Sequence, residues 1–133
     1  MMQTATPYHL ALTPLSNIYL EDSYVLNIIE NSDLISFEME FVLTEKHELY
    51  QAPKPYEQYC YRRGAINFIE CENTVLVLSG QPPSKDVTGE TDLGNIDVFI
   101  DFEGKYFVEG NWGRLETSCK EVTVKFKSES HTP

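Results

Sequence analysis

Apolar and polar residues alternate along several segments of this chain, and this period of two restricts its fold more than any other feature. In segment 34–43 every second residue is apolar: Ile35, Phe37, Met39, Phe41 and Leu43. Ser36, Glu38 and Glu40 lie between them. The same pattern runs through 96–102, where it places Asp97, Phe99 and Asp101 outward, and through 121–126. Such alternation is typical of a β-strand with one buried face and one solvated face.

Short turn segments separate these predicted strands. Asn31–Asp33, Glu103–Gly104 and Gly110–Gly113 each interrupt the alternation for only a few residues. A connection between parallel strands needs about a dozen residues, whereas antiparallel neighbours need only a short turn. The two long connections, 44–57 and 79–94, contain prolines and have the length at which loops are usually functional or flexible.

We therefore predict an all-β fold, in which residues 1–133 form one antiparallel sandwich or flattened barrel of seven to nine strands. The chain has 133 residues, which suits one domain with one core. Residues 1–20 are expected to be an irregular or short-helical lead-in, with Thr13 as helix N-cap and Pro14 as the first helical residue. At most one short helix is expected, and residues 128–133 should form a frayed tail.

The charge is strongly acidic, with a formal net charge of −11. Nucleic acids and anionic membranes attract basic surfaces, so we expect neither as a partner. The sequence lacks the 18 to 20 consecutive apolar residues of a membrane helix, and its N-terminus lacks the basic start of a signal peptide. Three widely spaced cysteines are unlike a disulfide framework, so we expect reduced thiols and a cytoplasmic protein.

The acidic residues are unevenly distributed along the chain. Residues 1–45 contain seven carboxylates and no lysine or arginine, and residues 86–104 contain six more and again no basic residue. If these stretches share one sheet face, they form a negative patch for a basic protein. The predicted contact residues are Glu38, Glu40, Asp97, Phe99 and Asp101. Phe99 would then be an exposed aromatic contact, unless a loop or helix covers it.

A second set of residues suggests small-ligand binding. The segment 56–64 contains three tyrosines beside the only adjacent pair of basic residues in the chain, and Trp112 lies close to Arg114. Arginine and tyrosine can bind a carboxylate or phosphate through paired hydrogen bonds and stacking. The alternative hypothesis is therefore a β-barrel that binds an anion through Tyr59, Tyr61, Arg62, Arg63 and Trp112. The interpretation without a ligand is that both arginines pair with neighbouring carboxylates and that Trp112 is a packed core residue.

Residues for catalysis or metal binding show no recognisable pattern. His9, His47 and His131 lie in three separate regions, without the spacing of metal ligands. No histidine lies near Cys60 or Cys71, and no common nucleophile or phosphate-binding motif occurs. We expect no metal, no cofactor and no catalytic residue, so an enzyme is only the third hypothesis.

The segment Glu21-Asp22-Ser23-Tyr24-Val25-Leu26, followed by a hairpin into Leu34–Phe37, resembles the opening of small bacterial immunity-type proteins. The rest of the chain resembles uncharacterised small β-rich bacterial proteins. This resemblance implies a protein that neutralises a partner toxin by binding it. The leading expectation is accordingly a non-catalytic module, monomeric or homodimeric, that binds a basic protein through an acidic sheet face.

Overall fold

The computed structural model describes residues 6–7, 15–80, 84–85 and 91–127. Its elements are β1 (Thr6–Pro7), η2 (Leu20–Asp22), β2 (Tyr24–Glu30), β3 (Leu34–Leu43), β4 (Cys60–Leu78), β5 (Ser84–Lys85), β6 (Thr91–Asp92), β7 (Ile96–Phe102), β8 (Lys105–Gly110) and β9 (Gly113–Phe126). The predicted tail, 128–133, lies outside the described residues, as do Thr13 and Pro14. Among the described residues, no helix is long and apolar enough to cross a membrane.

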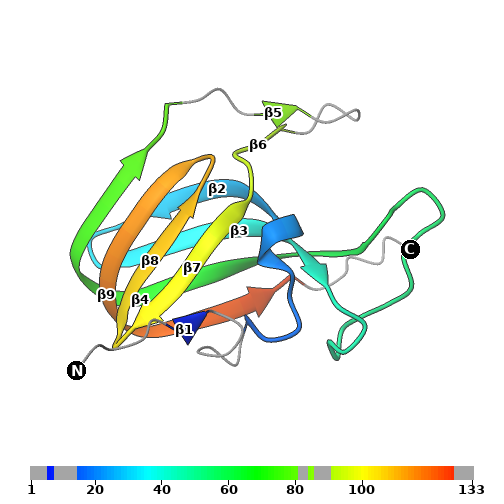
Figure 1. Cartoon of the computed structure of the whole chain (residues 1–133), viewed down its shortest axis with the longest axis horizontal. Helices are drawn as coiled ribbons and strands as arrows, with labels where there is room; N and C mark the ends of the chain where they lie inside the picture. The colour runs from blue at the N-terminus through cyan, green and yellow to red at the C-terminus, as the bar shows by residue number, and fades with distance from the viewer. Residues whose placement is uncertain (1–5, 8–14, 81–83, 86–90, 128–133) are drawn as a thin grey trace.

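All the strand pairs are antiparallel, and the main sheet has the order β1-β7-β8-β9-β4-β3-β2. Six of its strands have six or more residues within the described part of the chain, and β1 has two. Figure 1 shows that this sheet is strongly curved, with β7, β8 and β9 in front of β2 and β3. The all-β class and the antiparallel pairing are confirmed, whereas the strand number of seven to nine and the sandwich or flattened-barrel form stay predictions.

The turns predicted from the sequence are found where expected. β2 and β3 are joined by residues 31–33, and the Asn31 amide donates to the Leu34 carbonyl. Glu103 and Gly104 connect β7 to β8 with φ angles of 53° and 85°. Two successive positive φ angles are typical of the tight hairpin turn that matches the twist of a β-sheet. The Asp101 carboxylate accepts a hydrogen bond from the Gly104 amide at 2.9 Å and supports this turn.

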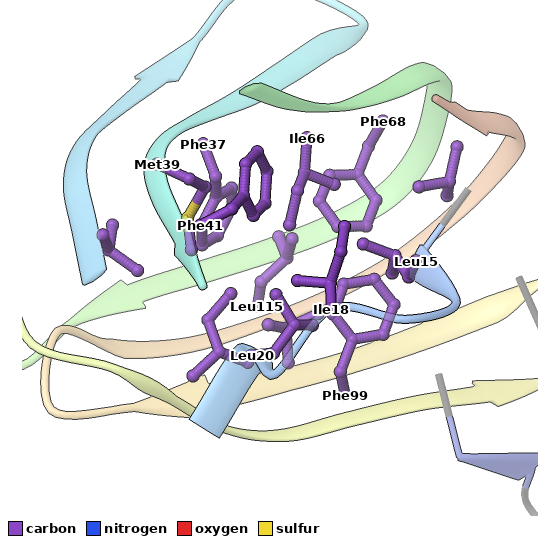
Figure 2. Close-up of a cluster of buried hydrophobic side chains, with 14 of the residues drawn as sticks. Leu15, Ile18, Leu20, Phe37, Met39, Phe41, Ile66, Phe68, Phe99 and Leu115 are labelled. Carbon is purple, nitrogen blue, oxygen red and sulfur yellow. The ribbon is translucent and has the colours of Figure 1, made fainter. Parts of the chain in front are cut away.

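Most buried side chains come from the concave face of the sheet, and Leu15, Ile18 and Leu20 of the lead-in and η2 pack with them (Figure 2). The predicted inward residues of β3 are all buried: Ile35, Phe37, Met39, Phe41 and Leu43. Phe68 of β4 lies at the centre, with ring centroids 5.8 Å from Phe37, 5.8 Å from Phe99 and 6.0 Å from Tyr106. One aromatic ring therefore connects strands from both ends of the sheet.

Strand β7 contradicts the predicted exposure of Phe99. The pairing of β7 with β8 shifts between Ile96 and Val98, so one extra residue, Asp97, interrupts the alternation. Such a shift reverses which face each later side chain occupies. Phe99 is consequently buried, with 3% exposure, and stacks on Phe68 at an interplanar angle of 19°.

The segment before β7 is hydrogen-bonded to β2 and to the residue before β2. The Val25 amide donates to the Gly94 carbonyl and the Leu93 amide donates to the Val25 carbonyl, both at 2.8 Å. The Asn95 side chain also donates to the Ser23 carbonyl at 2.6 Å. The residues before β7 are therefore held beside β2 without a continuous strand pair.

The described part of the lead-in is irregular, which is one of the two forms expected from the sequence. Within the described part of the lead-in, residues 15–19 form a turn and an isolated bridge from Ile18 to Leu43, and the one-turn 3-10 helix η2 follows. Residues 74–78 form the end of β4, where Leu78 is 61% exposed. The reason is that β3 pairs with β4 only as far as Ile69, so the later residues of β4 have β9 as a neighbour on one side only.

Candidate functional site

The acidic residues predicted on β3 lie on the convex face of the sheet, among cations. Glu38 and Glu40 alternate with the buried residues of β3. Arg63 is opposite Glu40 on β4, and its Nε lies 3.2 Å from the Glu40 Oε2. The register partner of Glu38 is Ala65 of β4, and the partner of Ala65 on β9 is Lys125. This part of the sheet is therefore mixed in charge, not uniformly negative.

The other predicted acidic contacts lie elsewhere. Asp97 and Asp101 belong to β7, and β8, β9 and β4 separate that strand from β3 within the sheet. Asp101 is opposite Tyr106 and accepts the turn hydrogen bond described above, whereas Asp97 is exposed at the register shift. With Phe99 in the core, the predicted contact set does not form one continuous surface.

The predicted anion-binding set is also divided. Arg62 is opposite the buried Phe41, and its Nε donates to the Lys127 carbonyl at 3.0 Å. Arg63 projects from the other face of β4, as the alternation predicts. Trp112 is a core residue with 4% exposure, and its ring centroid lies 5.0 Å from that of Phe37. Trp112 is therefore packed in the core, which is the interpretation that the sequence favoured over a contact with a ligand.

Tyr59, in contrast, lines a surface groove, and Tyr61 lies beside Tyr59. Their ring centroids lie 6.1 Å apart at an interplanar angle of 83°. The groove has a volume of about 690 Å³ and is formed by segments that are distant in sequence: residues 17–21, 43–46 and 50–60. Its lining includes Tyr19, Tyr50 and Tyr59. This volume lies within the range of about 300–1,000 Å³ that is typical of ligand sites.

Five tyrosines line the groove or adjoin it, and we refer to them as the tyrosine surface: Tyr19, Tyr24, Tyr50, Tyr59 and Tyr61. Tyr24 of β2 is opposite Glu40, and Tyr61 follows two residues after Tyr59. The tyrosine surface therefore combines β2, β4, the lead-in and the long loop after β3. Glu40 and Arg63 form an ion pair beside it. The region therefore contains one residue of the predicted acidic set, Glu40, and three of the predicted anion-binding set, Tyr59, Tyr61 and Arg63.

Carboxylates dominate the electrostatics of this region. Burial raises the pKa of Tyr24, and the charges of Asp92, Glu40 and Asp22 raise it further. Burial also raises the pKa of Tyr61, with smaller contributions from Tyr24, Glu40 and Glu57. Both phenols therefore stay neutral at physiological pH. Glu21 and Glu45 add negative charge along the groove, where Lys46 is the cation.

The lead-in is fixed beside β3 by Ser23, which is fully buried. The Ser23 hydroxyl donates to the Tyr19 carbonyl at 2.6 Å and accepts from the Val42 amide at 2.8 Å. The Tyr19 amide donates in turn to the Val42 carbonyl at 2.9 Å. One hydroxyl thus holds the backbone that presents Tyr19, whose side chain is half exposed.

Replacing Ser23 with alanine is expected to lower the free energy of unfolding by about 1–3 kcal/mol, because the buried Val42 amide loses its acceptor. Urea denaturation followed by circular dichroism measures this loss. Ser118→Ala is a suitable control, since Ser118 is only partly buried on β9. Equal stabilities of the two variants would contradict the role given to Ser23.

Among the described residues, no group of three or more histidine, cysteine, aspartate or glutamate side chains could hold a metal ion. His47 packs edge-on against Phe126, with ring centroids 5.2 Å apart. Burial lowers its pKa, and the Arg62 charge lowers it further against the opposing effect of Glu48. His9 and His131 lie outside the described residues.

Sequence reasoning did not find Tyr19, Tyr24, Tyr50 or the groove carboxylates as parts of one site. The available signals were the unusual length of the 44–59 connection and the concentration of tyrosines around Cys60. Comparison of the chain with family models, with curated proteins and with solved structures returns no match. The function is therefore inferred from the residues and geometry of this surface.

Proposed function

We propose that this chain is a non-catalytic protein-binding module whose tyrosine surface and adjoining groove engage a basic segment of another protein. The observation that supports this proposal is that three tyrosines and two glutamates from distant segments line one groove, with Tyr24 and Tyr61 close to Tyr59. The proposal keeps the predicted basic partner but moves the contact away from the β7 carboxylates. Neutralisation of a toxin-like protein would be one form of this function.

The chemistry of the groove suits lysine and arginine side chains. Tyrosine and arginine are enriched among the residues that dominate protein interfaces, because they bury a large area and keep a polar group for hydrogen bonding. A cation over a tyrosine ring gains about 0.5–2 kcal/mol, and the carboxylates of Glu21 and Glu45 would balance its charge. Opposite charges on the two proteins would also accelerate their encounter.

The first test uses decalysine and decaarginine peptides as stand-ins for a basic segment, with binding measured by isothermal titration calorimetry. Tyr59→Ala and Tyr61→Ala are each expected to weaken binding about tenfold, because each ring forms part of the contact. Tyr56→Ala is the matched control, since Tyr56 is 82% exposed and belongs neither to the groove lining nor to the tyrosine surface. We also expect the affinity to fall strongly as the salt concentration rises.

A second pair of variants separates a local site from general attraction to an acidic protein. Glu21→Gln combined with Glu45→Gln removes two negative charges at the groove. Glu109→Gln combined with Glu121→Gln removes the same charge from exposed positions on β8 and β9. Only the first pair is expected to weaken binding of the peptides substantially. Equal effects of the two pairs would overturn the proposed location.

Binding of a small molecule in the same groove is a second candidate, and the groove volume favours it. The lining carboxylates suit a cationic ligand better than the anion expected from the sequence, because Arg63 is already paired with Glu40. A thermal-shift screen with organic cations and metabolite anions distinguishes these possibilities. A rise in melting temperature with a cation that Tyr59→Ala abolishes would support this second function.

A further inference from the structure

Two of the three cysteines face each other across adjacent strands. Cys71 of β4 is the register partner of Cys119 of β9, and both thiols are free and partly exposed. Both side chains also pack against the edge of the same hydrophobic core, so they project from the same face of the sheet. The pair lies some ten residues along β4 from Tyr59 and Tyr61, away from the tyrosine surface.

An irregularity in β4 determines how the two cysteines meet. Glu70 and Asn73, on either side of the cysteine, have positive φ angles of 56° and 53°. The Cys71 amide donates to the Asp33 carbonyl at 2.8 Å, and the Cys119 amide donates to the Gly104 carbonyl at 3.3 Å. Each amide therefore points away from the opposite cysteine, as in a non-hydrogen-bonded pair of an antiparallel ladder.

This type of pair has the geometry that a disulfide needs. Residues in non-hydrogen-bonded pairs have Cα atoms about 4.5 Å apart and the closer side chains of the two pair types. Disulfides join residues whose Cα atoms are about 4.4–6.8 Å apart. The backbone thus needs little movement for the two sulfur atoms to bond.

The cysteine pair is also accessible from solvent. Cys71 and Cys119 line a surface cavity of about 590 Å³ together with Asp33, Glu70 and Lys120. The Cys71 thiol donates to the Phe68 carbonyl at 3.2 Å, so it is held at the wall of this cavity. A small disulfide molecule can therefore reach the sulfur atoms without unfolding the sheet.

We propose that Cys71 and Cys119 form a reversible intramolecular disulfide by exchange with a low-molecular-weight disulfide such as oxidised glutathione. The Cys71 thiolate attacks one sulfur of the small disulfide, forms a mixed disulfide and releases one small thiolate. The Cys119 thiolate then attacks the Cys71 sulfur and releases the second small thiolate. Overall the protein loses two protons and two electrons, and the small disulfide becomes two small thiols.

The environment of Cys119 fits the order of these two steps. Burial, and secondly the charge of Cys71, raise the pKa of Cys119 to about 12, so Cys119 is rarely a thiolate in the reduced protein. The first attack is therefore assigned to Cys71. Once Cys71 is part of a mixed disulfide it carries no negative charge, and that contribution to the Cys119 pKa disappears.

The experiment equilibrates the full chain in buffers with graded ratios of oxidised to reduced glutathione, blocks free thiols and determines the mass of the intact protein. We expect a species that carries one blocking group, on Cys60, where the reduced chain carries three, and a Cys71–Cys119 peptide after digestion. In guanidinium chloride, half-oxidation should require a ratio of oxidised to reduced glutathione at least about tenfold higher than in native buffer. The oxidised protein should melt on the order of 10 °C higher, because the bond closes a long loop.

Cys60→Ser is the matched control and should oxidise as the unmodified chain does, whereas Cys71→Ser and Cys119→Ser should yield only mixed disulfides. The masses and peptides of the unmodified chain are sufficient to test the disulfide, so the test does not depend on whether each variant folds. Independent glutathione adducts on the cysteines, or a disulfide that includes Cys60, would overturn the proposal. So would equal glutathione ratios for oxidation in native buffer and in denaturant.

Discussion

Replacement of Phe68 by alanine is expected to lower the free energy of unfolding by about 3–5 kcal/mol, the range for large-to-small changes at buried aromatic residues. Phe68 is fully buried, and its ring contacts Phe37, Phe99 and Tyr106. Alanine would leave a cavity where strands from both ends of the curved sheet meet. Because single domains are stable by only about 5–15 kcal/mol, this variant should be close to unfolding. Urea denaturation at 25 °C measures the loss.

The matched control for this variant is Tyr56→Ala, which removes a ring of similar size from the 82% exposed Tyr56 in the loop before β4. We expect its stability to change by less than about 0.5 kcal/mol, as is usual for surface substitutions. A loss below about 1 kcal/mol for Phe68→Ala would contradict the central position given to this ring.

Replacement of Gly113 by alanine is expected to cost at least about 3 kcal/mol, although only one methyl group is added. Gly113 begins β9 with a φ of +136°, a conformation that residues with a side chain rarely adopt. Its added Cβ would lie 1.9 Å from the Val77 carbonyl oxygen, well inside van der Waals contact. The end of β4 and the β8–β9 turn that carries Trp112 would both have to move.

Gly104→Ala measures the cost of a positive φ angle without the steric clash. Gly104 also has a positive φ, +85°, but nothing lies within 4 Å of the position of its Cβ. Its substitution should therefore cost only about 1–2 kcal/mol, the usual penalty for the left-handed region. Thermal and urea denaturation of the two alanine variants give the comparison. Similar losses would show that close approach to Val77 does not constrain the fold.

The local sequence was sufficient to predict several strands and turns of this fold. The alternation in 34–43 coincides with β3 at both ends, and its apolar residues are the ones that are buried. The Glu103–Gly104 turn was predicted because glycine accepts a positive φ at no steric cost, and both residues have one. These features depend on neighbours in the chain, which a sequence displays directly.

Features that depend on strand register were not predictable in this way. The extra residue Asp97 in β7 moves Phe99 from the solvated face to the core, and no glycine or proline within β7 signals this shift. The positive φ angles at Glu70 and Asn73 likewise change the direction of the Cys71 amide. Both irregularities follow from how β4, β7 and their partner strands fit together, not from local preference.

The candidate site illustrates the same limit for function. The sequence indicated Tyr59 and Tyr61 and a surplus of negative charge, but it divided them between two hypotheses. The fold brings the tyrosines near Glu40, because β2, β3 and β4 are neighbours in the sheet. It also disperses the predicted acidic set, since Glu40 pairs with Arg63 and Asp101 supports a turn.

The most direct test of the central claim is a chemical-shift titration of the ¹⁵N-labelled chain with decaarginine at low and high salt concentration. We expect the perturbed amides to lie in segments 17–24, 40–46 and 57–63, which contain most of the tyrosine surface and the groove lining. The perturbations should become much smaller at about 0.5 M salt, where exposed charges are screened within a few ångströms. Perturbations centred on β7 to β9, or of equal size at both salt concentrations, would contradict the proposed binding surface.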